Sequence, residues 1–162
     1  MKKTANRRMM TLTGILVLLI CAALTGCGQE EPVDVKKTAD QVYEAISFED
    51  SLTLTNDAMA QMLYGYEAAD VKQAYVYISA GATTEEIAAF ECTDAEAASR
   101  VYQAAQQRIE NQKQSVMSYK PEELNRLDAA ELRQKQSCVI LVISSVEQTA
   151  DVQKILNDSI GS

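Results

Sequence analysis

The chain of 162 residues contains no histidine and no tryptophan. Histidine is the usual general base near neutral pH, the base in Ser-His-Asp and Cys-His sites, and the commonest zinc ligand. Its absence excludes these classes of hydrolase and zinc site. No spacing is typical of a calcium-binding loop or of a glycine-rich phosphate-binding loop either. The sequence therefore predicts no catalytic residue, no cofactor and no metal site.

Basic residues are scarce and unevenly distributed. The chain has 15 Lys and Arg against 23 Asp and Glu, and four of the basic ones are Lys2, Lys3, Arg7 and Arg8. From residue 27 onward, 11 basic residues face 23 acidic ones, which gives a net charge of −12. Phosphate backbones repel so acidic a chain, which excludes nucleic acid as a partner. The acidic surface is either simply solvated or collects cations or a cationic polymer.

The first 26 residues have the layout of a secretory signal. Four basic residues precede an apolar run over about 9–24, which only Thr11, Thr13 and Gly14 interrupt. A basic start followed by an apolar segment is typical of export. At roughly 16 residues the run is short for a stable membrane span, which needs about 20.

The end of this leader, Leu24-Thr25-Gly26-Cys27, resembles the bacterial lipobox. The resemblance implies cleavage between Gly26 and Cys27 and a diacylglycerol on the Cys27 thiol. Two acyl chains suffice for stable anchoring. We therefore expect a lipoprotein of the extracytoplasmic face of the cell membrane, with a signal peptide at 1–26, an acidic tether at 27–37 and a single α+β domain at 38–162. A plain secreted protein and an uncleaved anchor are the alternatives.

Two cysteines remain after the leader and its lipid acceptor, Cys92 and Cys138. An exported protein can form a disulfide, so these cysteines are either buried free thiols or a disulfide. A reactive thiol is the third and least favoured alternative, because no base or cluster of cations lies beside either cysteine.

Apolar periodicity predicts four helices and four strands. The first helix begins at Asp34 or Thr38 and packs through Ala39, Val42, Tyr43 and Ile46, and the others span 57–64, 94–117 and 147–160. Strands are predicted at 73–79, 85–92, 131–135 and 138–144, and a loop or short extended segment at 47–55. The fold class is α+β, an antiparallel sheet of about four strands in two hairpins, with the order α-α-β-β-α-β-β-α. Helices on one side are expected, with some helix over the second face because 138–144 is apolar throughout.

Several side chains receive a specific placement. Met59, Met62 and Leu63 are expected to form the apolar face of the second helix, and Gln112 lies on the packing face of the long one. Glu85 and Glu86 are interpreted as solvated turn residues. Because neighbours on a strand point to opposite faces, they cannot act as a catalytic pair.

Several short motifs occur together along the chain: the lipobox, Tyr64-Gly65, Glu85-Glu86-Ile87, Tyr119-Lys120-Pro121, Leu127-Asp128-Ala129-Ala130 and the strand from Cys138. With these motifs the arrangement resembles a family of small lipoproteins from Gram-positive, mostly anaerobic bacteria that carry domain of unknown function 4358. The resemblance covers about 34–160 and implies the cellular location and the fold but no catalytic residues. One departure is Gln136-Ser137, where the family usually has a glycine before the apolar strand.

An anchor, one small domain and no catalytic constellation favour a binding or interaction module with an unknown protein or small-molecule partner. Tyr75, Tyr77 and Tyr119 are the candidate contact residues, since tyrosine is enriched at interfaces; the alternative is that their rings pack under helices. The second hypothesis is a hydrolase of the cell envelope that uses carboxylates or a metal held by oxygen ligands. A structural accessory to a membrane complex is the third.

Overall fold

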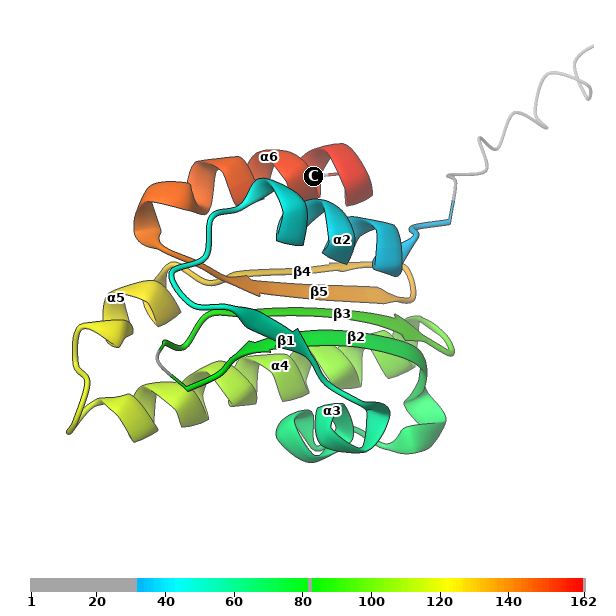
Figure 1. Ribbon diagram of the computed structural model, residues 1–162. Helices are drawn as coiled ribbons and strands as arrows, with labels where there is room; N and C mark the ends of the chain where they lie inside the picture. Colours follow the sequence, from blue (N-terminus) through cyan, green and yellow to red (C-terminus); the bar gives the residue numbers. More distant parts are fainter. Residues whose placement is uncertain (1–31, 82, 162) are drawn as a thin grey trace, which may run out of the picture. The chain divides into compact units, whose positions relative to one another are not determined.

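The structure, a computed structural model, describes residues 32–81 and 83–161 (Figure 1). From Val33 on, these residues belong to one compact unit, Val33–Ser162. The predicted signal peptide, its cleavage site and Cys27 lie outside the described residues. Among the helices of the described part, none has the length and apolar character that crossing a membrane requires.

A five-stranded antiparallel sheet forms the middle of this unit, in the order β1-β2-β3-β5-β4. The α+β prediction is confirmed, but β1 adds an edge strand to the expected four, and α5 adds a short helix. The elements in chain order are α2 (Val35–Ala45), β1 (Leu52–Leu54), α3 (Asp57–Tyr64), η1 (Ala68–Asp70), β2 (Val71–Ser79), β3 (Glu86–Cys92), α4 (Ala95–Val116), α5 (Glu123–Asp128), β4 (Glu131–Lys135), β5 (Cys138–Ile143), η2 (Val146–Gln148) and α6 (Thr149–Ile160).

Helices cover both faces of the sheet (Figure 1). On one face, α2 and α6 enclose a core cluster with Ile87, Ile140 and Val142. On the other face, α3 and α4 enclose a cluster with Phe90 and Leu141. Because β3 and β5 are buried from both sides, they are apolar over nearly their whole length, as strands between two helical layers must be. The expected cover on the second face is confirmed.

Local signals set the helix ends. The carboxylate of Asp34 accepts a hydrogen bond from the Lys37 amide at 2.9 Å, so α2 begins at Val35, inside the segment predicted as tether. Asn56 caps α3 and Asp94 caps α4 in the same way. Gly65 ends α3 with a φ of 67°, a left-handed conformation that favours glycine.

Two packing predictions are wrong. In α3 the buried residues are Ala60 and Tyr64. Of the three predicted residues, Leu63 packs partly against the core, while Met59 and Met62 are 39% and 69% exposed. An eight-residue helix offers two apolar stripes, and Tyr64 determines which one faces the sheet because its hydroxyl has a buried partner. In α2, Tyr43 is 44% exposed and stacks on Tyr77 with ring centroids 5.2 Å apart.

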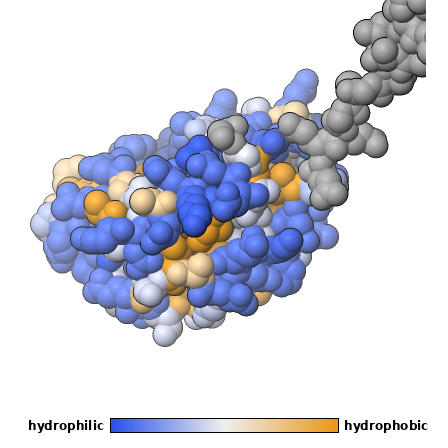
Figure 2. Space-filling view, turned by 90° about the horizontal axis from the view of Figure 1, so that it is seen from above, coloured by the Kyte–Doolittle hydropathy of each residue, from blue (hydrophilic) through white to orange (hydrophobic). Residues whose placement is uncertain are grey.

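The outer surface of α2 and α6 is mostly hydrophilic. Figure 2 looks onto this face and shows a strip of apolar residues between hydrophilic ones. A shallow groove runs between the two helices, with Gln41 and Glu44 on α2 and Ile155 and Asp158 on α6.

Candidate functional site

Two consecutive glutamates, Glu85 and Glu86, lead into β3, and each is only 1% exposed. They point to opposite faces of the sheet, as predicted: the partners of Glu85 lie in the α2–β1 loop and those of Glu86 on α3 and α4. Their interpretation as solvated turn residues is wrong. The apolar residues that follow draw β3 into the middle of the sheet, which takes both carboxylates out of water. Buried carboxylates need hydrogen-bond donors or cations.

Glu86 lies at the centre of a cluster of side chains between β3, α3 and α4. The Tyr64 hydroxyl donates to Oε1. Arg108 donates from Nη2 to Oε2 at 2.7 Å and from Nε to Oε1 at 3.3 Å. Gln112, one helical turn further along α4, donates from Nε2 to Oε2 at 2.8 Å. Both oxygens of this carboxylate are therefore fixed by donors from two helices.

The Glu86 cluster is largely dry, which sets the protonation of its members. The side chain of Arg108 is 19% exposed and that of Glu86 is 2% exposed. Burial lowers the pKa of the Arg108 guanidinium, but the charge of Glu86 and its hydrogen bonds outweigh burial, so the pKa is raised overall. Burial, followed by the charge of Glu86, raises the pKa of Tyr64 well above its usual value. The phenol thus stays protonated and remains a donor.

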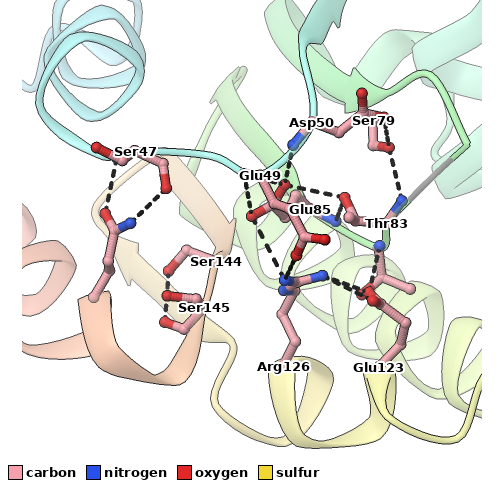
Figure 3. A network of polar contacts seen from close by, with 12 residues as sticks. Ser47, Glu49, Asp50, Ser79, Thr83, Glu85, Glu123, Arg126, Ser144 and Ser145 are labelled. Atoms are coloured by element: carbon pink, nitrogen blue, oxygen red, sulfur yellow. Dashed lines mark hydrogen bonds and ion pairs between the residues drawn. The ribbon is translucent and has the colours of Figure 1, made fainter.

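Glu85 has a different set of partners, drawn mainly from the backbone (Figure 3). The Glu49 amide donates to both of its oxygens, at 3.0 and 2.9 Å, and the Asp50 amide donates at 3.0 Å. The Thr83 hydroxyl adds a fourth hydrogen bond at 3.0 Å. This carboxylate therefore ties the loop between α2 and β1 to the turn between β2 and β3.

Arg126 and Glu123 attach α5 to the same region (Figure 3). Nη1 of Arg126 donates to both oxygens of Glu123, at 2.9 and 2.7 Å, and Nη2 lies 2.7 Å from Glu49 and 3.9 Å from Glu85. Oε2 of Glu123 also accepts from the Thr84 amide at 2.7 Å and from its hydroxyl at 2.8 Å. One guanidinium therefore neutralises part of a three-carboxylate network.

The pKa of Glu123 is the resultant of opposing effects. Burial raises it, but the hydrogen bonds from Thr84 and the ion pair with Arg126 outweigh burial, so the pKa is lowered. Burial also lowers the pKa of Arg126, and Glu49 and Glu123 reverse that effect.

Ser79 shapes the β2–β3 turn itself. Its hydroxyl donates to Asp50 at 2.5 Å and accepts from the amides of Gly81 and Thr83 at 3.1 Å each. These hydrogen bonds hold Gly81, Thr83 and the α2–β1 loop to the end of β2.

A small pocket of about 150 Å³ opens where this turn meets the C-terminal half of α4. Glu86, Arg108 and Gln112 contribute to its lining, together with Thr84 and Tyr119. Glu86 is buried whereas Tyr119 is 72% exposed, so the ion pair forms the floor and the tyrosine forms the rim. The Glu86 cluster thus lies beneath a pocket that a ligand can enter from solvent.

The three buried carboxylates act as hydrogen-bond acceptors within the fold. A general base needs a free acceptor directed at the substrate. The carboxylates of Glu85, Glu86 and Glu123 instead accept several internal hydrogen bonds each or lie beside a guanidinium. Such groups fix the positions of loops and helices.

The predicted contact tyrosines lie in two separate places. Tyr119 is at the rim of the pocket. Tyr75 and Tyr77 lie on the other face of the sheet, partly buried against the cluster that α2 covers. There the Tyr77 hydroxyl donates to Asp40 at 3.2 Å. Tyr75 and Tyr77 therefore pack in the manner of the alternative interpretation, while the role of all three as contacts stays a prediction.

The two cysteines of the domain are buried free thiols. Cys92 belongs to the core cluster under α4 and Cys138 to the cluster under α2 and α6, so they lie on opposite sides of the sheet. Burial, above all, raises the pKa of Cys92 to about 12 and raises that of Cys138. Within residues 32–81 and 83–161, no group of three or more Asp, Glu, Cys or His side chains is arranged to hold a metal ion.

Sequence reasoning missed Tyr64, Arg108, Glu123 and Arg126 as members of a buried polar network. A signal for part of it was present, since Gln112 was placed on the packing face of its helix. A polar side chain on such a face requires a buried partner. No pattern in the sequence identifies that partner as Glu86, which lies 26 positions away.

Comparison with known proteins gives one match. The family described as domain of unknown function (DUF4358) matches residues 35–144, from α2 to the end of β5. No curated protein and no solved structure matches the chain.

Proposed function

The chain belongs to the family of domain of unknown function DUF4358, and from that premise we propose that it is a lipid-anchored binding module on the extracytoplasmic face of the cell membrane. The lipid is attached to Cys27 after cleavage behind Gly26. The leader sequence supports the proposed location at the membrane, and the small pocket rimmed by Tyr119 supports the binding role. Its partner is a small molecule or the exposed end of a larger one.

The observation that carries the binding role is the buried ion pair at the floor of this pocket. A pair such as Glu86–Arg108 gains little stability over well-packed apolar residues, because both charges lose their hydration. Here it fixes two polar residues of α4 at a concave polar surface beside the β2–β3 turn. Groups held by packing and hydrogen bonds are what a preorganised binding site requires.

The hydrolase alternative finds less support. Each buried carboxylate in this region is already an acceptor for internal donors, so none is available to take a proton from water. A structural accessory to a membrane complex remains compatible with the same anchor and would use the same exposed surface.

Mass spectrometry of the membrane-extracted protein tests the predicted lipid anchor. We expect a mature chain that begins at a diacylated Cys27. The variant Cys27→Ala should lose the lipid and leave the membrane fraction. Cys21→Ala, which changes a cysteine in the leader only, is the matched control and should remain anchored. An intact Met1 or an unmodified Cys27 contradicts the proposal.

Photo-cross-linking in intact cells tests the binding role. A cross-linkable residue in place of Tyr119 should capture a defined partner or envelope component. The same residue at Gln107, on the solvent side of α4, is the control and should capture little. Equal yields from the two positions would contradict a binding site at the pocket.

A further inference from the structure

The size of the pocket limits what it can hold. Sites that enclose a whole drug-sized ligand measure roughly 300–1,000 Å³, whereas this pocket measures about 150 Å³. The pocket therefore accommodates one small ring or end group, and the rest of a longer ligand stays outside.

Two carboxylates and one guanidinium line the pocket, and both carboxylates already have internal partners. Glu86 is paired with Arg108 at 2.7 Å. Glu85 also contributes to the wall, and its oxygens accept hydrogen bonds from backbone amides. A free anion would be repelled by the two carboxylates, and a free cation would have to compete with Arg108 and the backbone amides for them. A neutral ligand meets neither penalty.

The residues that line the pocket include both hydrogen-bond donors and hydrogen-bond acceptors. Glu86 occupies Nε and Nη2 of Arg108, and this pair does not use Nη1. Because Gln112 donates its amide N–H to Glu86, its carbonyl Oε1 must point elsewhere, and among the described residues this buried oxygen has no hydrogen-bond partner. A guanidinium and an amide carbonyl one helical turn apart on α4 can together serve a hydroxyl group, which both donates and accepts.

The rim adds an apolar surface. The Tyr119 ring is 72% exposed and combines an apolar body with a polar tip. A pyranose ring presents C–H groups on its faces and hydroxyls around its edge. One molecule of that kind can therefore pack on the tyrosine and direct hydroxyls to the floor.

We propose that the pocket between the β2–β3 turn and α4 binds the terminal sugar residue of a neutral glycan. This inference rests on the proposed binding role and specifies its ligand class. Tyr119 packs against the face of the sugar, and Arg108 and Gln112 lie where its hydroxyls can reach with a small side-chain adjustment. The sugar remains chemically unchanged.

A titration with small probes tests the ligand class. The protein, purified from membranes in detergent micelles and isotope-labelled, is titrated with methyl glucoside, N-acetylglucosamine and chitotriose, and separately with sodium phosphate and putrescine. We expect at least one neutral sugar to shift the amide resonances of Thr84, Ser115 and Tyr119. Phosphate and putrescine should leave these resonances in place.

Two variants separate the pocket from the rest of the surface. Tyr119→Ala should weaken sugar binding by about fivefold to tenfold, the contribution of one aromatic contact. Tyr43→Ala removes another exposed tyrosine, on α2, and should leave the affinity unchanged. Tyr119→Ala should unfold at the same denaturant concentration as the unmodified protein, and Tyr43→Ala, which removes the ring stacked on Tyr77, at a slightly lower one.

The outcomes are distinct. Shifts caused only by phosphate or putrescine, shifts confined to other residues, or no shift with any of the three sugars overturn the glycan assignment. If Tyr119 nevertheless cross-links to a protein partner in cells, the binding role stands and only the ligand class fails. If no sugar shifts these resonances and Tyr119 captures no partner in cells, the binding role is contradicted as well.

Discussion

Glu85 and Glu86 are the same residue type at adjacent positions and are equally buried, yet they stabilise different parts of the fold. Glu86 accepts hydrogen bonds from side chains of two helices, including a guanidinium that is itself mostly enclosed. Glu85 accepts mainly from the backbone of a loop, with Arg126 at 3.9 Å. The first holds two helices against the sheet, and the second holds a loop.

The difference shows that burial alone does not determine what a charged residue contributes. The stability lost on removing such a residue depends on which buried hydrogen-bond donors lose their acceptor. Without Glu86 a buried guanidinium and a buried phenol lose their acceptor, whereas without Glu85 the exposed loop beside it can move to let water reach the freed amides. Four measurements test this contrast.

The largest effect is expected for Glu86→Ala. It leaves Arg108 as an enclosed cation without its partner, which should lower the free energy of unfolding by about 3–5 kcal/mol. Urea unfolding measures it. The matched control is Glu91→Ala, on the same strand, whose side chain is 36% exposed and forms only a surface pair with Lys72; it should cost about 0–1 kcal/mol. Equal losses from the two variants would show that the Glu86 cluster is not a special case.

Glu85→Ala should cost less, about 1–3 kcal/mol, because it leaves backbone donors unpaired but no enclosed cation. The location of the change distinguishes it from Glu86→Ala. Hydrogen exchange should accelerate at the amides of Glu49 and Asp50 and remain slow in α4. Faster exchange along α4 would mean that the loop and the helix are one cooperative unit.

Tyr64→Phe removes one hydrogen bond to a charged group and keeps the ring that packs edge-on against Phe90. The expected loss is about 1.5 kcal/mol by thermal or urea unfolding. Met62→Ser, on the same helix but at a position that is 69% exposed, should change stability by less than about 0.5 kcal/mol. If the methionine substitution proved the more damaging, the orientation of α3 would be different from the one described.

The smallest effect is expected in the acid limb of the stability profile. The pKa of Glu123 is lower in the folded protein than its usual value, so the folded chain binds fewer protons at this site than the unfolded chain does. Its contribution is therefore complete above the unfolded pKa of about 4.3 and is lost as the pH falls through the lowered folded pKa. Glu123→Gln should flatten this part of the profile below about pH 4.5, relative to the unmodified protein. An unchanged acid limb would exclude Glu123 as a contributor.

Much of the fold was predictable because short-range signals carry it. Alternation in residues 73–79 and the apolar run from Cys138 identified two strands, and the caps Asn56 and Asp94 located two helix starts. The three-residue β1 was the exception. A segment so short has no periodicity of its own, and it is a strand only because β2 pairs with it.

The candidate site was less predictable because its contacts are long-range. Arg108 reaches Glu86 across 22 positions, and Thr84 reaches Glu123 across 39. In the sequence, Arg108 and Arg126 both look like ordinary surface charges. The position of Tyr119 at a pocket rim likewise depends on how the end of α4 meets the β2–β3 turn.

The sequence by itself determined the family, the α+β class and most element positions, and it predicts the leader at 1–26, because each is encoded in neighbouring residues. Only the tertiary structure decided that α3 packs through Tyr64, that Glu85 and Glu86 are buried, and that Arg108 and Arg126 are their neighbours. The physical reason is that a buried charge is tolerated only where distant donors converge on it. That convergence is a property of the assembled layers and of no single segment.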